Sequence, residues 1–287
     1  MSQSLQGLAE IVADYDLFLF DQWGVVHNGQ TLYPRFQDTI EQLRATPSKT
    51  LLVLSNSSKR AIFSKQLMGE MGLPENLWDE IITSGEHCLQ CLRERPAGFY
   101  SNLGRKYYGI HWPEGYDLPD DLDYQAVSDI TAADFILLTG LGQSVAAYQP
   151  LLQQARALNL PLVCANPDLR APEGGVIKDC PGLILEQYRK MGGTISSHGK
   201  PAKELYDLIL QKYPHDPKRV LAIGDSLHHD IQGANNAGIS SLLLTQGIHC
   251  NDWNALLAQG HDTDSASAAL AAHSGAKFDY VMTGLRW

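Results

Sequence analysis

The sequence has no long apolar run, no excess of positive charge and no dense set of cysteines. No stretch approaches the roughly 18 unbroken apolar residues of a membrane span, and the N-terminus lacks the basic start and apolar run of a signal peptide. A net charge of −10 argues against binding to nucleic acid, which needs a basic surface. Five scattered cysteines, an odd number, fit free thiols in a reducing compartment better than disulfides. We therefore expect a cytoplasmic protein with no nucleic-acid or membrane partner.

The apolar segments that are present are short, and they alternate with amphipathic stretches. Seven runs are typical of buried parallel strands: Leu17–Phe20, Leu51–Leu54, Ile81–Thr83, Phe135–Leu138, Leu160–Cys164, Val220–Ile223 and Ser241–Leu244. The stretches between them have helical periodicity, as in Arg35–Arg44, Ala61–Met71, Ala146–Leu158 and Ala202–Lys212. This alternation predicts an α/β fold with a mostly parallel sheet covered on both faces.

The middle of the chain differs in composition from its two ends. Residues 85–190 carry most of the Tyr-rich and Pro-rich loop material and two further strand candidates. We predict a Rossmann-like core from residues 1–84 and 191–287, with a second α/β domain, residues 85–190, inserted into it.

Polar residues follow directly on several of the expected strands, where ligands of parallel sheets collect. Asp21 ends the first strand, and a carboxylate there can attack phosphorus. Gly24 allows a tight turn that aims backbone N–H groups at an anion. Ser55 ends the next strand and can donate its hydroxyl to a phosphate oxygen. Taken alone, these motifs are better explained by a turn Asp and a helix-capping Ser.

Two later motifs carry charge at the same kind of position. Lys200 lies between a glycine and a proline at the start of an expected helix, where it can hold a phosphate. A solvated surface lysine is the alternative. Asp225 and Asp230 follow a buried strand and are the strongest local signal, because hard oxygen ligands at this spacing suit Mg²⁺. A pair of capping aspartates is the alternative there.

The four motifs occur in the order nucleophile, hydroxyl, lysine and acid pair, and in this the chain resembles the haloacid dehalogenase (HAD) superfamily over nearly its whole length. The inserted segment narrows the resemblance. Cys164–Asp168, Pro181–Tyr188 and the join at Ile82–Glu86 resemble the cap region of the class IIA branch, which includes NagD-like sugar and nitrophenyl phosphatases.

The resemblance implies a Mg²⁺-dependent hydrolase that moves a phosphoryl group from a small phosphorylated metabolite to catalytic Asp21 and then to water. Lys200 would be the second catalytic residue. The implied metal ligands are Asp21, the backbone carbonyl of Trp23, Asp225 and Asp230. The implied substrate-binding residues are Gly24, Ser55, Asn56, Lys200, Asn166 and Asp168. Caps of this class often pair, so a homodimer through the cap is a further expectation.

Trp23 departs from the family pattern, in which a second Asp two residues after the nucleophile acts as acid and base. An indole does not ionise near neutral pH, and general acid–base help is worth roughly 10²–10⁴-fold in rate. Three hypotheses follow: a weak phosphatase selective for good leaving groups, an acid supplied by His27, His228 or His229, or a protein that binds and senses a phosphorylated metabolite.

A CxxC motif at Cys88–Cys91 has no second pair at zinc spacing. Its surroundings favour a helix, so we expect core packing of these cysteines in preference to metal or redox chemistry.

Overall fold

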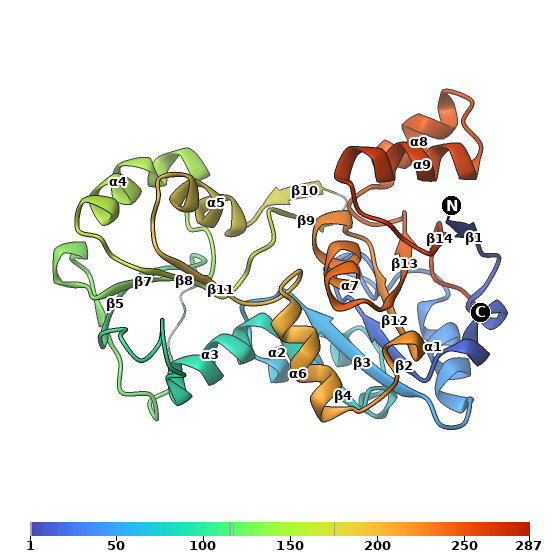
Figure 1. Ribbon diagram of the computed structural model, residues 1–287, viewed down its shortest axis with the longest axis horizontal. Coiled ribbons are helices and arrows are strands. Elements are labelled where there is room, and N and C mark those ends of the chain that lie inside the picture. Colours follow the sequence, from blue (N-terminus) through green and yellow to red (C-terminus); the bar gives the residue numbers. More distant parts are fainter. Residues whose placement is uncertain (1, 115, 117, 175) are drawn as a thin grey trace.

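The structure is a computed structural model that describes residues 2–114, 116, 118–174 and 176–287. The ribbon forms two lobes, and the chain crosses from the first into the second and back again (Figure 1). Each lobe is built on a parallel sheet. In the described part of the chain, no helix has the length and apolar character needed to cross a membrane.

The first lobe contains a seven-stranded parallel sheet in the order β1-β14-β13-β12-β2-β3-β4. The strands are β1 (Gln3–Ser4), β2 (Leu17–Phe20), β3 (Thr50–Ser55), β4 (Glu80–Thr83), β12 (Val220–Gly224), β13 (Ser240–Leu244) and β14 (Tyr280–Met282). In the central strands, Phe20 pairs with Val53 on one side and with Ile223 on the other. This register brings the residues that follow β2, β3 and β12 to one edge of the sheet.

Helices cover both faces of this sheet, because side chains of a strand alternate between its two faces. Phe18 and Phe20 pack with Phe36 of α1 on one face, whereas Leu17 and Leu19 belong to a separate cluster on the other, with α6. The helices of this lobe are α1 (Phe36–Ala45), α2 (Ala61–Glu70), α6 (Lys203–Lys212), α7 (Gln232–Ala237), α8 (Cys250–Ala258) and α9 (Thr263–Ser274).

The second lobe contains a five-stranded parallel sheet in the order β11-β8-β7-β5-β6. Its strands are β5 (Lys106–Ile110), β6 (Gln125–Val127), β7 (Phe135–Leu138), β8 (Leu162–Cys164) and β11 (Ile195–Ser197), and its helices are α3 (Ser84–Glu94), α4 (Gln149–Ala157) and α5 (Gly182–Lys190). An antiparallel hairpin, β9 (Arg170–Glu173) with β10 (Val176–Asp179), lies between the two lobes (Figure 1).

The α/β fold with its mostly parallel sheet is confirmed, and each of the seven expected strands is present. The helical stretch expected at Ala146–Leu158 is divided into a 3₁₀ turn, Val145–Tyr148, and α4. Pro150 explains this division, since a residue without an N–H fits the first turn of a new helix and not a helix interior. The hairpin strands β9 and β10 were missed because they are mostly exposed and form no apolar run.

The second sheet continues past residue 190, where the sequence predicted the return to the core. β11 pairs in parallel with β8, so residues 195–197 belong to this sheet. Three residues ending in two serines carry too little apolar pattern to be recognised as a strand. The division of the chain into a core and an inserted domain otherwise stays a prediction.

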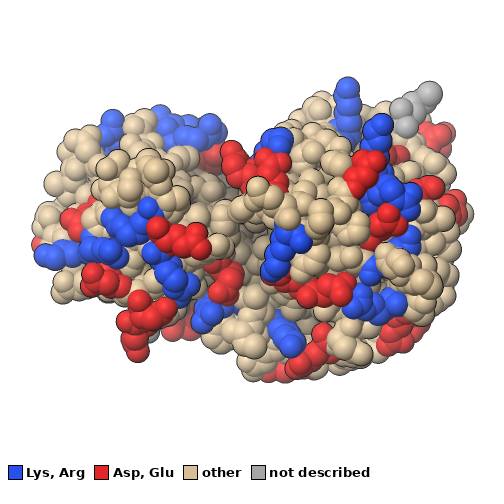
Figure 2. Space-filling view, turned by 60° about the horizontal axis from the view of Figure 1, so that its bottom comes forward, with Lys and Arg blue, Asp and Glu red and all other residues tan. Residues whose placement is uncertain are grey.

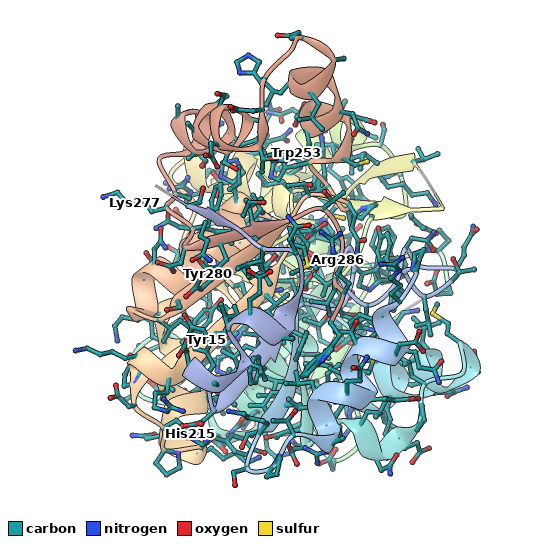
Figure 3. All side chains as sticks on the ribbon, turned by 90° about the vertical axis from the view of Figure 1, so that its right-hand side faces the viewer. Tyr15, His215, Trp253, Lys277, Tyr280 and Arg286 are labelled. Carbon is teal, nitrogen blue, oxygen red and sulfur yellow. The ribbon has the colours of Figure 1, made fainter. Side chains whose placement is uncertain are left out.

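The two ends of the described chain lie side by side at the β1–β14 edge of the large sheet (Figure 1). The Arg286 guanidinium donates to the carbonyl of Gln6, and the Leu8 N–H donates to the Arg286 carbonyl at 2.8 Å. The Tyr15 hydroxyl donates a hydrogen bond to the Tyr280 hydroxyl at 3.0 Å, and both residues are labelled in Figure 3. These contacts tie the first fifteen residues to the last strand.

Asp16 stabilises the start of β2 in a way that acid should remove. Arg219 donates to both carboxylate oxygens, and these hydrogen bonds lower the pKa of Asp16 from 3.8 to about 2, with a smaller contribution from Lys49. A depressed folded-state pKa gives stability that is present above the unfolded value and is lost as pH falls from about 4 to 2. In urea titrations, the stability advantage of wild type over Asp16→Asn should therefore shrink across this range.

Asp207→Asn is the matched control, because the Lys203–Asp207 pair is exposed within one helix and contributes a few tenths of a kcal/mol at most. If the stability difference between wild type and Asp16→Asn stays constant from pH 4 to pH 2, the role given to Arg219 is contradicted.

Candidate active site

Three carboxylates and one ammonium meet at the carboxyl ends of β2 and β12. Asp21 follows β2, Asp225 follows β12, and Asp230 lies in the helical turn Leu227–Ile231. One carboxylate oxygen of each lies within 4.8 Å of the others, and none of the three residues is more than 9% exposed. Lys200 Nζ donates to Asp21 Oδ1 at 2.5 Å and to Asp230 Oδ1 at 2.6 Å. The structure thus joins residues from three separate sequence motifs.

With its three carboxyls ionised and Lys200 protonated, this cluster carries a net negative charge. Burial raises the pKa of Asp21 to about 8 and that of Asp225 well above its usual range, and the neighbouring carboxylates add to both shifts. Burial opposes the charge on Lys200, but Asp21 and Asp230 outweigh it and raise the pKa of the amine. A buried surplus of negative charge on oxygen ligands is the setting that a hard divalent cation neutralises. The residues therefore fit Mg²⁺.

Two glycines let the backbone close around Asp225. A Cβ on Gly24, whose φ is +87°, would lie 1.9 Å from Asp225 Oδ2, and a Cβ on Gly247 would lie equally close. The Ile248 N–H donates to the same oxygen at 2.7 Å. Sequence reasoning missed Gly247 and Ile248, although the strand-end rule that led to Asp21 would have led from β13 to this loop.

Asn56 connects the lysine to the core and to the second lobe. Its Oδ1 accepts from the Lys200 N–H at 2.7 Å, and its Nδ2 donates to the Lys200 carbonyl at 3.1 Å and to Asp168 Oδ1 at 2.8 Å. Gly199 has a φ of +108°, and a Cβ there would lie 2.3 Å from Asn56 Oδ1. The Asn56 side chain is therefore a brace that fixes the backbone from which the ammonium extends.

Two other expected phosphate-binding groups, the Ser55 hydroxyl and the Gly24 N–H, differ in whether a hydrogen is free to donate. Ser55 is buried beside the carboxylates, and its Oγ accepts from the Ser57 N–H at 3.2 Å, which leaves the hydroxyl hydrogen to donate. The Gly24 N–H, in contrast, donates to the His27 carbonyl at 2.9 Å and so closes its own turn.

The second lobe reaches the cluster through the loop after β8. Asn166 Oδ1 accepts from the Asp168 N–H at 3.0 Å, and Asp168 in turn lies 3.6 Å from His229 Nε2. The tip of the β9–β10 hairpin contacts the turn after the nucleophile, because the Gly174 N–H donates to the Asn28 carbonyl at 3.1 Å. The lobes are therefore in contact over the carboxylates. On the face drawn in Figure 2, acidic and basic side chains are interspersed over both lobes.

Two cavities adjoin at this interface. A small one of about 30 Å³ is lined by the three carboxylates, Lys200 and Ser55, and a larger one of about 490 Å³ lies beside it. Trp23, Asp168 and Ala171 line both. The larger cavity has apolar walls at Phe63, Leu67 and Trp112 and charged groups at Lys59, Glu70, Glu114 and Lys178.

Trp23 lies at the junction of the two cavities, at the position where the family has its acid. Its ring packs edge-on against His27 at 4.9 Å, and a Cβ on Gly29 would lie 2.4 Å from its six-membered ring. Ordered packing of an indole here leaves this position without a group that can exchange a proton.

The three histidines near the site differ in access to it. Burial lowers the pKa of His27 to about 4, and its two ring nitrogens meet the Gly29 N–H and the Gln22 amide. His228 is exposed. His229 lines the small cavity and donates from Nδ1 to the Lys200 carbonyl at 3.3 Å. Of the three, His229 is the one placed to meet a leaving group.

Comparisons with known proteins agree with this architecture. The family described as haloacid dehalogenase-like hydrolase matches residues 18–111, and a second, described as HAD-hydrolase-like, matches residues 197–272. Glycerol-3-phosphate phosphatase of Rattus norvegicus is 26% identical over 266 residues, which cover 83% of this chain and 81% of that protein.

Solved structures give the same fold. A haloacid dehalogenase-like hydrolase from Brucella suis superposes with a TM-score of 0.81 at 27% identity, over 98% of this chain and 99% of that one. A glycerol phosphate phosphatase from Mycobacterium tuberculosis, solved in complex with magnesium, has a TM-score of 0.61 at 22% identity, over 83% of this chain and 70% of that one. Taken with the convergence of Asp21, Lys200, Asp225 and Asp230, these matches show that the chain belongs to the haloacid dehalogenase-like hydrolases, and the named phosphatases among its relatives are consistent with class IIA.

Proposed function

We propose that this protein is a Mg²⁺-dependent phosphatase of small phosphorylated metabolites that works through a phosphoenzyme on Asp21. The observation that carries the proposal is the buried cluster of Asp21, Asp225 and Asp230 around the Lys200 ammonium. The similarity to named phosphatases supports the reaction class.

Each site residue has its own role in the proposed reaction. An oxygen of Asp21 forms a bond to phosphorus while the bond to the leaving oxygen breaks, and the leaving group takes that electron pair. The Lys200 ammonium neutralises charge on the phosphoryl oxygens, and the Ser55 hydroxyl donates to one of them. Water then cleaves the acyl phosphate and releases inorganic phosphate. Mg²⁺, when held by the Asp21, Asp225 and Asp230 carboxylates and the Trp23 carbonyl, supplies further neutralisation of the phosphoryl charge.

The two cavities suggest where the two parts of a substrate bind. The small one, of about 30 Å³, lies directly beside Asp21 and Lys200 and would receive the phosphoryl group. The rest of the metabolite would occupy the larger cavity past Trp23. Asn166 and Asp168 then face the substrate from the second lobe, and contact between the lobes excludes bulk water during the reaction.

A second candidate function, binding or sensing of a phosphorylated metabolite with little turnover, is favoured by one observation. Trp23 gives no proton to a leaving group, so a poor leaving group must depart unassisted or take a proton from His229. The nucleophile, metal ligands and phosphate-binding groups are all retained, which is sufficient for binding.

The assignment of Asp21 as nucleophile, with Trp23 in place of an acid, predicts how phosphate release depends on the leaving group and on Asp21. With Mg²⁺, wild type should release phosphate from p-nitrophenyl phosphate faster than from glycerol phosphate, and Asp21→Asn should release it from neither at a measurable rate, because an amide does not attack phosphorus. Release by Asp21→Asn at the wild-type rate would exclude Asp21 as nucleophile. Tight Mg²⁺-dependent binding of glycerol phosphate without turnover would select the sensing function.

Restoring an acid at position 23 should increase turnover of the poorer leaving group. Trp23→Asp is expected to raise glycerol phosphate hydrolysis by about 10²-fold or more, since general acid–base catalysis contributes roughly 10²–10⁴-fold. Trp23→Phe is the matched control, because it also opens the junction between the cavities but adds no acid. Equal rates in the two variants would show that space, and not proton transfer, limits wild type.

The charge imbalance predicts opposite effects of Asp225→Asn with and without metal. In the absence of Mg²⁺ the variant should be more stable than wild type, on the order of 1 kcal/mol, because wild type must either bury this carboxylate among like charges or protonate it at a pH above its usual pKa, whereas the amide needs neither and keeps an acceptor oxygen. Mg²⁺ at 100 times its dissociation constant should stabilise wild type by about 2.7 kcal/mol and the variant by much less. Differential scanning calorimetry measures both, and a metal-free variant that melts below wild type would contradict the imbalance.

A further inference from the structure

We propose that His87, Cys91 and His198 form a second metal site, for a borderline or soft cation such as Zn²⁺, where the chain passes between the two lobes. This cluster shares no residue with the carboxylate site, and its nitrogen and sulfur ligands suit a different class of metal from Mg²⁺. The proposal does not depend on the phosphatase activity.

The three ligand atoms lie close together, and the two nitrogens have the separation expected for ligands of one zinc ion. One donor atom of each residue lies within 4.8 Å of the others, and the two Nδ1 atoms of His87 and His198 are 3.3 Å apart. Two nitrogens bound tetrahedrally at the usual Zn–N distance of roughly 2.0–2.1 Å stand about 3.3–3.4 Å apart. His87 and Cys91 are four residues apart on α3 and therefore project from the same side of that helix.

A neighbouring tyrosine orients one of these ligands toward the cluster. The Tyr100 hydroxyl bonds His198 Nε2 and lies 3.0 Å from Ser196 Oγ, so it occupies the outer ring nitrogen and keeps Nδ1 toward the cluster.

The two cysteines of the CxxC motif have different surroundings. Cys88 is fully buried among Leu92, Tyr107 and Phe135, which agrees with core packing. Cys91 and His87 are partly exposed and so can be reached by an ion from solvent. This cluster could not be recognised from the sequence, because its third member, His198, lies more than a hundred residues after Cys91.

The position of the cluster gives it a structural consequence. α3 carries the chain from β4 into the second lobe, and His198 lies on the return segment, two residues before Lys200. A cation bound here links the outgoing and returning segments. Zinc should therefore stabilise the junction of the lobes without touching the carboxylates.

The test uses Co²⁺ as a spectroscopic probe on the full chain, reduced with a phosphine, with Mg²⁺ in excess to occupy the carboxylate site. One equivalent of Co²⁺ should produce a thiolate-to-cobalt charge-transfer band and strong tetrahedral visible bands, and one equivalent of Zn²⁺ should abolish them. Cobalt on carboxylates gives neither feature, so the signal separates the two sites.

Cys91→Ser should lose the charge-transfer band, and Cys250→Ser is the matched control, because Cys250 is a partly exposed thiol on α8 in the first lobe. Tyr100→Phe should keep the band but weaken metal binding about 10–100-fold, the usual effect of removing a hydrogen bond to a ligating His. His87→Gln provides a second ligand variant should Cys91→Ser unfold, as judged by circular dichroism.

The melting temperature is the second measurement. Zn²⁺ should raise it in wild type and in Cys250→Ser, and should not raise it in Cys91→Ser or His87→Gln. Absence of the thiolate band in folded wild type, or a band of equal intensity in Cys91→Ser, would overturn the proposal. The His87–His198 contact would then be a hydrogen bond between two packed imidazoles and nothing more.

Discussion

This chain must place three carboxylates around a single ammonium in a region that water scarcely reaches. Lys200 pairs with Asp21 and Asp230 at 2.5 and 2.6 Å, and Asp225 lies beside them without a cationic partner of its own among the described residues. Such an arrangement costs free energy in the absence of a cation, because desolvation and like-charge repulsion both act against it. The divalent metal and the phosphoryl group of the proposed function would offset this cost.

The geometry around this cluster depends on residues that carry no charge. Gly24 and Gly247 allow two loops to reach the same Asp225 oxygen, and Asn56 fixes the Lys200 backbone while bonding Asp168 of the second lobe. The same hydrogen-bonded group thus positions the lysine and joins the lobes. The position of the lysine and this contact between the lobes therefore depend on one side chain.

Trp23 changes the chemistry of the site without changing its framework. The indole packs on His27 and Gly29 and separates the space beside the carboxylates from the larger cavity. It gains packing and a defined wall where relatives of this type place a proton donor. His229 also lines the small cavity, where its Nε2 lies 3.6 Å from Asp168 Oδ1.

Local pattern determined much of the fold and most of the residues of the candidate site. The strands around Asp21, Ser55 and Asp225 were readable because buried parallel strands are continuous apolar runs, and the rule that ligands gather at strand ends predicted their convergence. The β9–β10 hairpin and β11 were not readable, because short polar strands have no such run.

Tertiary structure alone decided which groups meet. Asn56 holds Lys200, Gly247 reaches Asp225, and His198 faces His87 and Cys91, each across a long stretch of sequence. Periodicity and turn chemistry report on a residue and its near neighbours in the chain. Distances between side chains far apart in sequence depend on strand order and on the contact between the two lobes, which no local pattern encodes.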